Sequence, residues 1–170
     1  MDKNISNILS AINEAEIIYN KLSPYLSQDN FFIQNLKKYE AEIEKSFKLM
    51  NKLELPRLCG YCATKIPGGG CCGEQIATWY DPILLSLNLF MGLRLQTKSY
   101  YDNSCIFLGR DGCTLKARYH FCVNYLCSRI YQALDEKDLQ LLRSQYGKEL
   151  FSSWQLEIFI KNLLKKNQND

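Results

Sequence analysis

The residues of this sequence with the most distinctive chemistry are its eight cysteines, which fall into two groups in the middle of the chain. One group lies in the segment CGYCATKIPGGGCC and the other begins with the segment CIFLGRDGC. Their spacing is C-x2-C-x8-CC, then a gap of 32 residues, then C-x7-C-x8-C-x4-C. The eight residues are Cys59, Cys62, Cys71, Cys72, Cys105, Cys113, Cys122 and Cys127.

Clustered thiols serve as disulfides, as redox reagents or as metal ligands, and the compartment separates these uses. The first twenty residues, MDKNISNILSAINEAEIIYN, lack the basic stretch and uninterrupted apolar run of a secretory signal. We therefore expect a cytoplasmic protein, in which thiols stay reduced. A disulfide scaffold would need export, so metal ligation is the preferred interpretation and redox chemistry an alternative.

The spacing agrees with thiolate ligation of a metal. A C-x2-C turn lets two thiolates converge on one ion while backbone N–H groups point at sulfur. We expect Gly60 inside this turn, and Gly68, Gly69 and Gly70 before the doublet, to allow tight approaches and positive φ angles. Because adjacent side chains diverge, the Cys-Cys doublet fits two ions, two irons of one cluster, or one ligand and one spare thiol.

The identity of the cofactor stays open at this point. Zinc favours tetrahedral thiolate sites with short-turn pairs, but this chain has one C-x2-C where a zinc ribbon has two. Iron–sulfur sites tolerate long, irregular gaps, although the short repeated gaps of bacterial ferredoxins are absent. The expected cofactor is therefore mononuclear zinc or iron, or an iron–sulfur cluster.

The order of these motifs resembles the YkgJ-like cysteine-cluster family of zinc- or iron-chelating proteins. The resemblance covers the cysteine-rich middle and not the two ends of the chain. This sequence departs from the family in having Tyr119 after the arginine, where Pro is common, and a wider gap before the doublet. The matching pieces are the C-x2-C turn, the doublet, CIFL at 105–108, GC at 112–113, Arg118 and CVNYLC at 122–127.

The resemblance implies a metal cofactor more than a reaction. Some relatives are linked to flagellin lysine methylation, which keeps a protein-modifying enzyme among the alternatives. Apart from the resemblance, GGGCCG lacks the Lys-Ser/Thr of a phosphate-binding loop, and a single histidine gives no convincing Ser-His-Asp arrangement. The sequence thus names a cofactor class and leaves catalysis open.

Several residues near the cysteines have simpler expected roles. His120, the only histidine, is expected beside the ligands or exposed rather than as a ligand. Arg118 is expected to pair with a carboxylate or to neutralise a thiolate-rich centre, and Lys116 could share that role. Glu74 and Asp111 are expected to be solvated loop acids.

Charge and hydropathy limit the partners. The net charge of +3 is too small to predict nucleic acid as a partner. The most apolar run, within residues 80–98, is shorter than ~18 residues and carries Arg94, so no membrane span is expected. The expected partner is a metal ion, with a protein partner left open.

Apolar periodicity predicts helices at both ends of the chain. An apolar face from Ile5 to Leu22 predicts one helix, which Pro24 should end. A second face, from Phe32 to Leu53, predicts another that ends before Pro56. A short turn joins the two, so we expect an antiparallel pair.

Three further segments are predicted to be helical. Asp81 and Pro82 resemble a cap and a first turn for a mostly buried helix over 80–98, although the leucines there also alternate as in a strand. A short helix is predicted from 122 to 134, and a long one begins after Asp135 with a bend at Gly147. Its expected buried side is Leu139, Leu142, Tyr146, Leu150, Trp154, Ile158 and Leu164.

The predicted fold class is mainly α, with a helical frame from both chain ends around an irregular cysteine-rich metal-binding middle. The single domain would consist of a helical hairpin at 1–55, the cysteine region at 56–130, and a C-terminal helix at 131–170 packing on the hairpin. The predicted function is a cytoplasmic protein that chelates zinc or iron through thiolates. The alternatives are an iron–sulfur protein with redox or protein-modifying activity, and a zinc-stapled interaction module.

Overall fold

The computed structural model describes residues 3–65 and 70–166, and within them the chain is mainly helical, which confirms the predicted class. Short 3-10 turns and one two-stranded antiparallel hairpin join the helices. The helices are α1 (Lys3–Leu26), α2 (Asn30–Lys52), α3 (Leu55–Lys65), α4 (Pro82–Phe90), α5 (His120–Asn124), α6 (Ser128–Ala133) and α7 (Glu136–Lys166). The other elements are η1 (Gly70–Cys72), η2 (Glu74–Trp79), β1 (Leu108–Gly109) and β2 (Gly112–Cys113).

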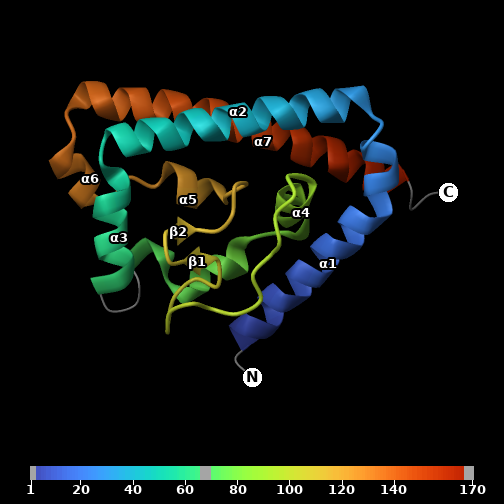
Figure 1. Ribbon diagram of the computed structural model, residues 1–170, viewed down its shortest axis with the longest axis horizontal. Helices are drawn as coiled ribbons and strands as arrows, with labels where there is room; N and C mark the ends of the chain where they lie inside the picture. The colour runs from blue at the N-terminus through green and yellow to red at the C-terminus, as the bar shows by residue number, and fades with distance from the viewer. Residues whose placement is uncertain (1–2, 66–69, 167–170) are drawn as a thin grey trace.

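The long helices form a frame around the shorter elements (Figure 1). Helices α2 and α7 run side by side along one edge of the molecule, and α1 and α3 extend from opposite ends of α2. Helix α4 packs against α1, while the hairpin, η1, η2 and α5 lie in the space between α1 and α3. The cysteine-bearing elements therefore occupy the interior of the frame.

Helices α1 and α2 do not form the antiparallel pair that the sequence predicts. They diverge from the turn that joins them, and α4 enters between them (Figure 1). The ring of Phe90, at the end of α4, lies 5.0 Å from the rings of both Tyr19 on α1 and Phe32 on α2. The apolar face of α1 is buried against α4 instead, and that of α2 against α7.

The ends of α1 and α2 partly follow the predicted signals. Pro24 does not end α1, which continues to Leu26; the proline removes one N–H donor, and the last turn stays helical around it. Asp29 caps α2, its Oδ1 accepting from the N–H of Phe32 at 2.8 Å.

Helix α4 is shorter than predicted. Asp81 caps it as expected, accepting from the N–H groups of Ile83 and Leu84. It ends at Phe90 because Gly92, with φ +78°, begins a left-handed turn. The N–H groups of Gly92 and Leu93 then bond to the carbonyls near the helix end, which closes a Schellman motif.

Helix α7 is continuous through Gly147, so the helix does not break at this residue. The buried side agrees with the prediction as far as Tyr146, but Trp154 and Ile158 are exposed, whereas Glu149 and Ser153 are buried. From Leu142 to Ile158 the predicted stripe advances by four residues at each step, and each such step rotates about 40° around a helix of 3.6 residues per turn. Because polar side chains occupy part of the buried side of α7, apolar periodicity alone did not identify that side.

The segment from 122 to 134 forms two helices instead of one. Helix α5 ends at Asn124 and α6 begins after Cys127, with residues 125–127 extended between them. No helix in the described parts of the chain is both long enough and apolar enough to cross a lipid bilayer.

Candidate metal centre

The C-x2-C pair lies on a helix rather than in the predicted tight turn. Cys59 and Cys62 are three residues apart on α3, which puts both on one face, and Gly60 lies within the helix. Gly70 does adopt the expected positive φ, +57°. Gly68 and Gly69 lie outside the described residues.

The doublet connects α3 to the second group of cysteines. A Cβ atom at Gly70 would lie 3.3 Å from the Cβ of Cys62, so this glycine lets η1 approach α3 closely. On the other side, the N–H of Cys105 donates to the carbonyl of Cys72 at 2.8 Å, and Gly73 forms a β-bridge with Ser104. These contacts join segments separated by 32 residues of sequence.

The hairpin positions the next two cysteines. Cys105 is buried just before β1, and its carbonyl accepts from the N–H of Leu108 at 2.9 Å. Cys113 on β2 is exposed and pairs across the hairpin with Leu108. At the other end of β1, a Cβ at Gly109 would clash with Thr114 at 2.8 Å, so the turn requires glycine there.

The last two cysteines come from the short helices. Cys122 lies on α5, and the hydroxyl of buried Tyr80 donates to its Sγ at 3.7 Å. Cys127 is the N-cap residue of α6. On α6, Nη1 of Arg129 lies 3.6 Å from the Sγ of Cys62, and its guanidinium covers the ring of Tyr61. Helix α6 is thereby held against α3.

The thiols are close enough to change one another's ionisation. Burial, and then neighbouring thiols, raise the pKa of Cys59 to about 11 and that of Cys105 to about 12. Burial likewise raises the pKa of Cys122 to about 11. In the doublet, a hydrogen bond from the thiol of Cys72 lowers the pKa of Cys71 and raises that of Cys72 itself.

All eight predicted ligands lie within the described residues, and each is a free thiol. The same described ranges, 3–65 and 70–166, contain no three His, Cys, Asp or Glu side chains already placed to hold a metal ion. The assignment of the eight cysteines as ligands therefore stays a prediction. The fold brings the cysteine-bearing segments together without placing their sulfur atoms in ligating positions.

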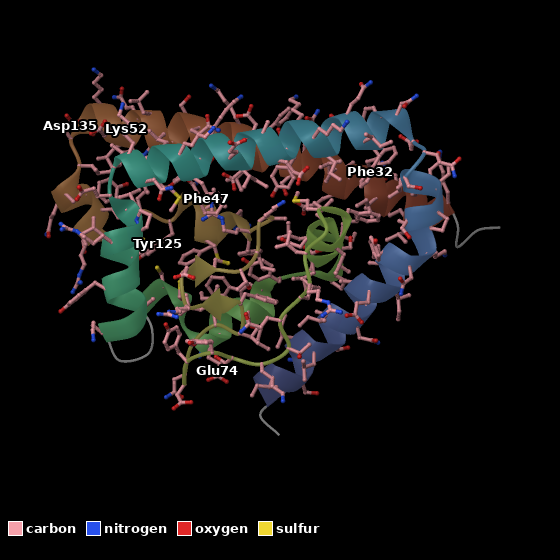
Figure 2. All side chains as sticks on the ribbon, in the orientation of Figure 1. Phe32, Phe47, Lys52, Glu74, Tyr125 and Asp135 are labelled. Carbon is pink, nitrogen blue, oxygen red and sulfur yellow. The ribbon has the colours of Figure 1, made fainter. Side chains whose placement is uncertain are left out.

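A buried ion pair lies beside the cysteines. Nη2 of Arg118 is 3.5 Å from Oε1 of Glu149 on α7, and the two side chains are 6% and 0% exposed. The guanidinium also covers the ring of Phe47, 4.7 Å from its centre, and approaches the sulfur of Met50. Figure 2 labels Phe47 on α2, above the shorter elements. The predicted pairing of Arg118 with a carboxylate is confirmed.

This ion pair is incompletely satisfied. Nε and Nη2 of Arg118 and both carboxylate oxygens of Glu149 are buried without a hydrogen-bond partner among the described residues. Burial raises the pKa of Glu149 despite the nearby arginine, whereas Glu149 and Cys113 raise the pKa of Arg118 despite its burial. The positive charge of Arg118 also favours the ionised forms of Cys59 and Cys122.

Asn88 positions the segment that leads into Arg118. This fully buried side chain donates to the carbonyl of Ala117 at 3.0 Å, and its Oδ1 accepts from the N–H groups of Lys116 and Ala117 at 2.9 Å each. Asn88 was not among the predicted site residues, although a single asparagine in the apolar run PILLSLNLF indicates a buried amide that needs hydrogen-bond partners. Glu149 gave no comparable signal within its polar surroundings.

The remaining nearby residues have modest roles. The ammonium of Lys116 pairs with a different carboxylate, that of Glu40, at 3.1 Å, so it shares the predicted pairing with a carboxylate. His120 and Asp111 are exposed, and Glu74 is half-buried at the edge of the molecule remote from α2 (Figure 2). None of these side chains alters the set of candidate ligands.

Comparison with known proteins gives no relative: no family model, no curated protein and no solved structure matches this chain. The resemblance to the YkgJ-like family, which depends on the cysteine motifs, accordingly stays a prediction.

Proposed function

We propose that this protein binds zinc or iron through cysteine thiolates held inside its helical frame. The observation that carries the proposal is the mutual proximity of thiols from segments far apart in the sequence. Cys71 and Cys127 both raise the pKa of Cys59, although 68 positions separate Cys59 from Cys127 (127 − 59). Folding a chain to collect thiols costs loop entropy, which metal–thiolate bonds can offset.

The donor set fits a soft or borderline cation. Thiolates suit Zn²⁺, Fe²⁺ and iron–sulfur clusters, whereas Mg²⁺ and Ca²⁺ require oxygen ligands. Side chains of cysteine can change χ1 rotamer without moving the backbone, and this rotation is the adjustment that the donors need to converge. The eight cysteines would supply the ligands, and a bound metal would fix the fold of the region between α3 and α6.

The local charges support the same function. A tetrahedral zinc bound by four thiolates carries a net charge of about −2, which is costly to bury without a counter-charge. Arg118 provides a buried positive charge next to Cys59, Cys113 and Cys122.

Anaerobic purification of the full chain, followed by metal analysis and a visible spectrum, tests the proposal. A colourless protein with stoichiometric zinc supports a mononuclear site, and a brown one with iron and acid-labile sulfide supports the iron–sulfur form. Cys59→Ser/Cys105→Ser should bind markedly less metal, whereas the matched control Ser99→Ala/Ser128→Ala should bind as the wild type. A protein that takes up neither metal after reconstitution under reducing conditions would contradict the function.

A further inference from the structure

The elements that carry the cysteines form two sets of backbone contacts, which divide the eight thiols into two groups of four. The helix group comprises Cys59, Cys62, Cys71 and Cys127 on α3, η1 and the start of α6. The hairpin group comprises Cys72, Cys105, Cys113 and Cys122 on η1, the hairpin and α5. We propose that each group holds its own metal ion, so that the chain binds two ions side by side; this inference rests on the proposed function.

Backbone packing assembles the helix group. Cys59 and Cys62 share one face of α3, and Gly70 packs against Cys62, which brings Cys71 next to that face. Helix α6 packs against α3, with Cys127 at its first turn and Arg129 reaching back to the sulfur of Cys62. Four thiols from three segments thus surround one end of the frame.

A different set of contacts assembles the hairpin group. The bond from the Cys105 N–H to the Cys72 carbonyl places these two residues in adjacent segments. Cys113 lies opposite Leu108 on the hairpin that begins just after Cys105. The Tyr80 hydroxyl, which packs on the same core, holds Cys122.

The two hydrophobic cores divide the cysteines in the same way. Cys72, Cys105 and Cys122 belong to the large core formed with α1, α4 and the hairpin. Cys59 and Cys127 pack instead against the small core at the other end of α7. Membership of a hydrophobic core does not depend on the chemistry of sulfur. Its agreement with the backbone contacts therefore supports the division of the cysteines into two groups.

The doublet is the boundary between the two sites. Since adjacent side chains diverge, one cysteine of the pair can serve each ion, which accounts for the two consecutive thiols. Each Zn²⁺ forms four Zn–S bonds and displaces four thiol protons to solvent, about eight protons for the loaded chain.

Titration of the reduced, metal-free full chain with Co²⁺ tests the inference, because tetrahedral thiolate Co²⁺ absorbs in the visible region. The wild type should bind about two equivalents, and proton release in weak buffer should match them. The double variant Cys62→Ser/Cys127→Ser, within one group, should keep about one equivalent. The double variant Cys62→Ser/Cys113→Ser removes one ligand from each group, so it should bind no equivalent of Co²⁺ with the wild-type affinity.

The control and the contradicting outcomes are distinct. Ser99→Ala/Ser128→Ala should retain about two equivalents, and far-ultraviolet circular dichroism should confirm a helical frame in every variant compared. Saturation of the wild type at one equivalent, or equal loss in the within-group and across-group variants, would overturn the division while leaving metal binding intact. Absence of any Co²⁺, zinc or iron uptake would instead overturn the proposed function.

Discussion

The helical frame and the cysteine-rich interior are stabilised in different ways. In the frame, α1, α2 and α7 bury continuous side-chain stripes, with residues such as Ala15, Tyr39 and Leu156 fully buried. In the interior, η1, β1 and β2 are each only two or three residues long, and α5 and α6 have five and six. Elements this short are not stable alone, because a helix or hairpin of this size forms too few hydrogen bonds to offset its ordering entropy.

The difference shows that the interior depends on individual polar contacts. Asn88 fixes the chain before Arg118, Glu149 accompanies the guanidinium, and Tyr80 holds Cys122. These contacts connect α4, α7 and the residue after η2 to the segments that carry Arg118 and Cys122. We therefore expect the interior to be more sensitive than the frame to single changes and to loss of a cofactor.

The largest expected effect follows removal of the metal. If thiolate bonds stabilise the interior, chelation should expose residues 58–65 and 70–127 to hydrogen exchange well before α2 and α7. Hydrogen–deuterium exchange with and without a chelator measures the difference. Uniform protection along the described chain after chelation would remove the proposed distinction between interior and frame.

Loss of the buried carboxylate should be the most damaging single substitution. Glu149→Ala leaves Arg118 buried without its counter-charge and should lower the free energy of unfolding by about 3–5 kcal/mol. The double variant Arg118→Met/Glu149→Met should be less destabilised in urea denaturation. Glu44→Ala, which breaks an exposed pair with Lys48, is the control and should cost about 0.5 kcal/mol or less.

Removal of the Asn88 side chain should affect the interior more than the frame. Asn88→Ala leaves the buried N–H and carbonyl of Ala117 without their partner, at an expected cost of about 2–3 kcal/mol. Asn35→Ala, which removes an exposed hydrogen bond within α2, should change stability by less than about 0.5 kcal/mol. Equal costs in thermal denaturation would contradict the special dependence of the interior on Asn88.

The metal-free protein should lose stability in alkaline solution. The pKa of Cys59 and of Cys122 is about 11 in the folded chain against an ordinary value of 9.0. Because folding favours the protonated thiols, their contribution is complete below pH 9.0 and is lost as the pH rises through about 11. Between pH 9.0 and about 11, the denaturant midpoint should fall less steeply with pH for Cys59→Ser than for the wild type. An equally steep fall in both proteins would contradict the contribution of the Cys59 thiol.

A pair of glycine substitutions should give the smallest contrast. Gly147→Ala lies within α7, where the added Cβ meets no atom within 4 Å, and should stabilise the frame by up to about 1 kcal/mol. Gly70→Ala introduces a side chain at φ +57° against Cys62 and should destabilise the interior by about 1 kcal/mol. If the denaturation midpoints of Gly147→Ala and Gly70→Ala shifted in the same direction, the expected difference between frame and interior would be wrong.

The parts of the structure that depend on local chemistry could be predicted from the sequence. The existence of helices in 3–26, 30–52 and 136–166 follows from apolar periodicity, and the caps Asp29 and Asp81 follow from residue type. The end of α4 was also encoded, since Gly92 stands where the helix stops, but the alternating leucines beyond it masked the signal. Local hydrogen bonding and backbone sterics determine these features.

Only the tertiary structure decided how these elements meet. The sequence predicted eight candidate ligands, but their partition depends on Gly70 packing against α3 and on a backbone bond between Cys72 and Cys105. It also could not reveal that Glu149 is buried opposite Arg118, because a charged residue on a long helix is ordinarily solvated. Long-range contacts depend on the shape of the whole chain, whereas residue type and spacing specify only the local chemistry that those contacts bring together.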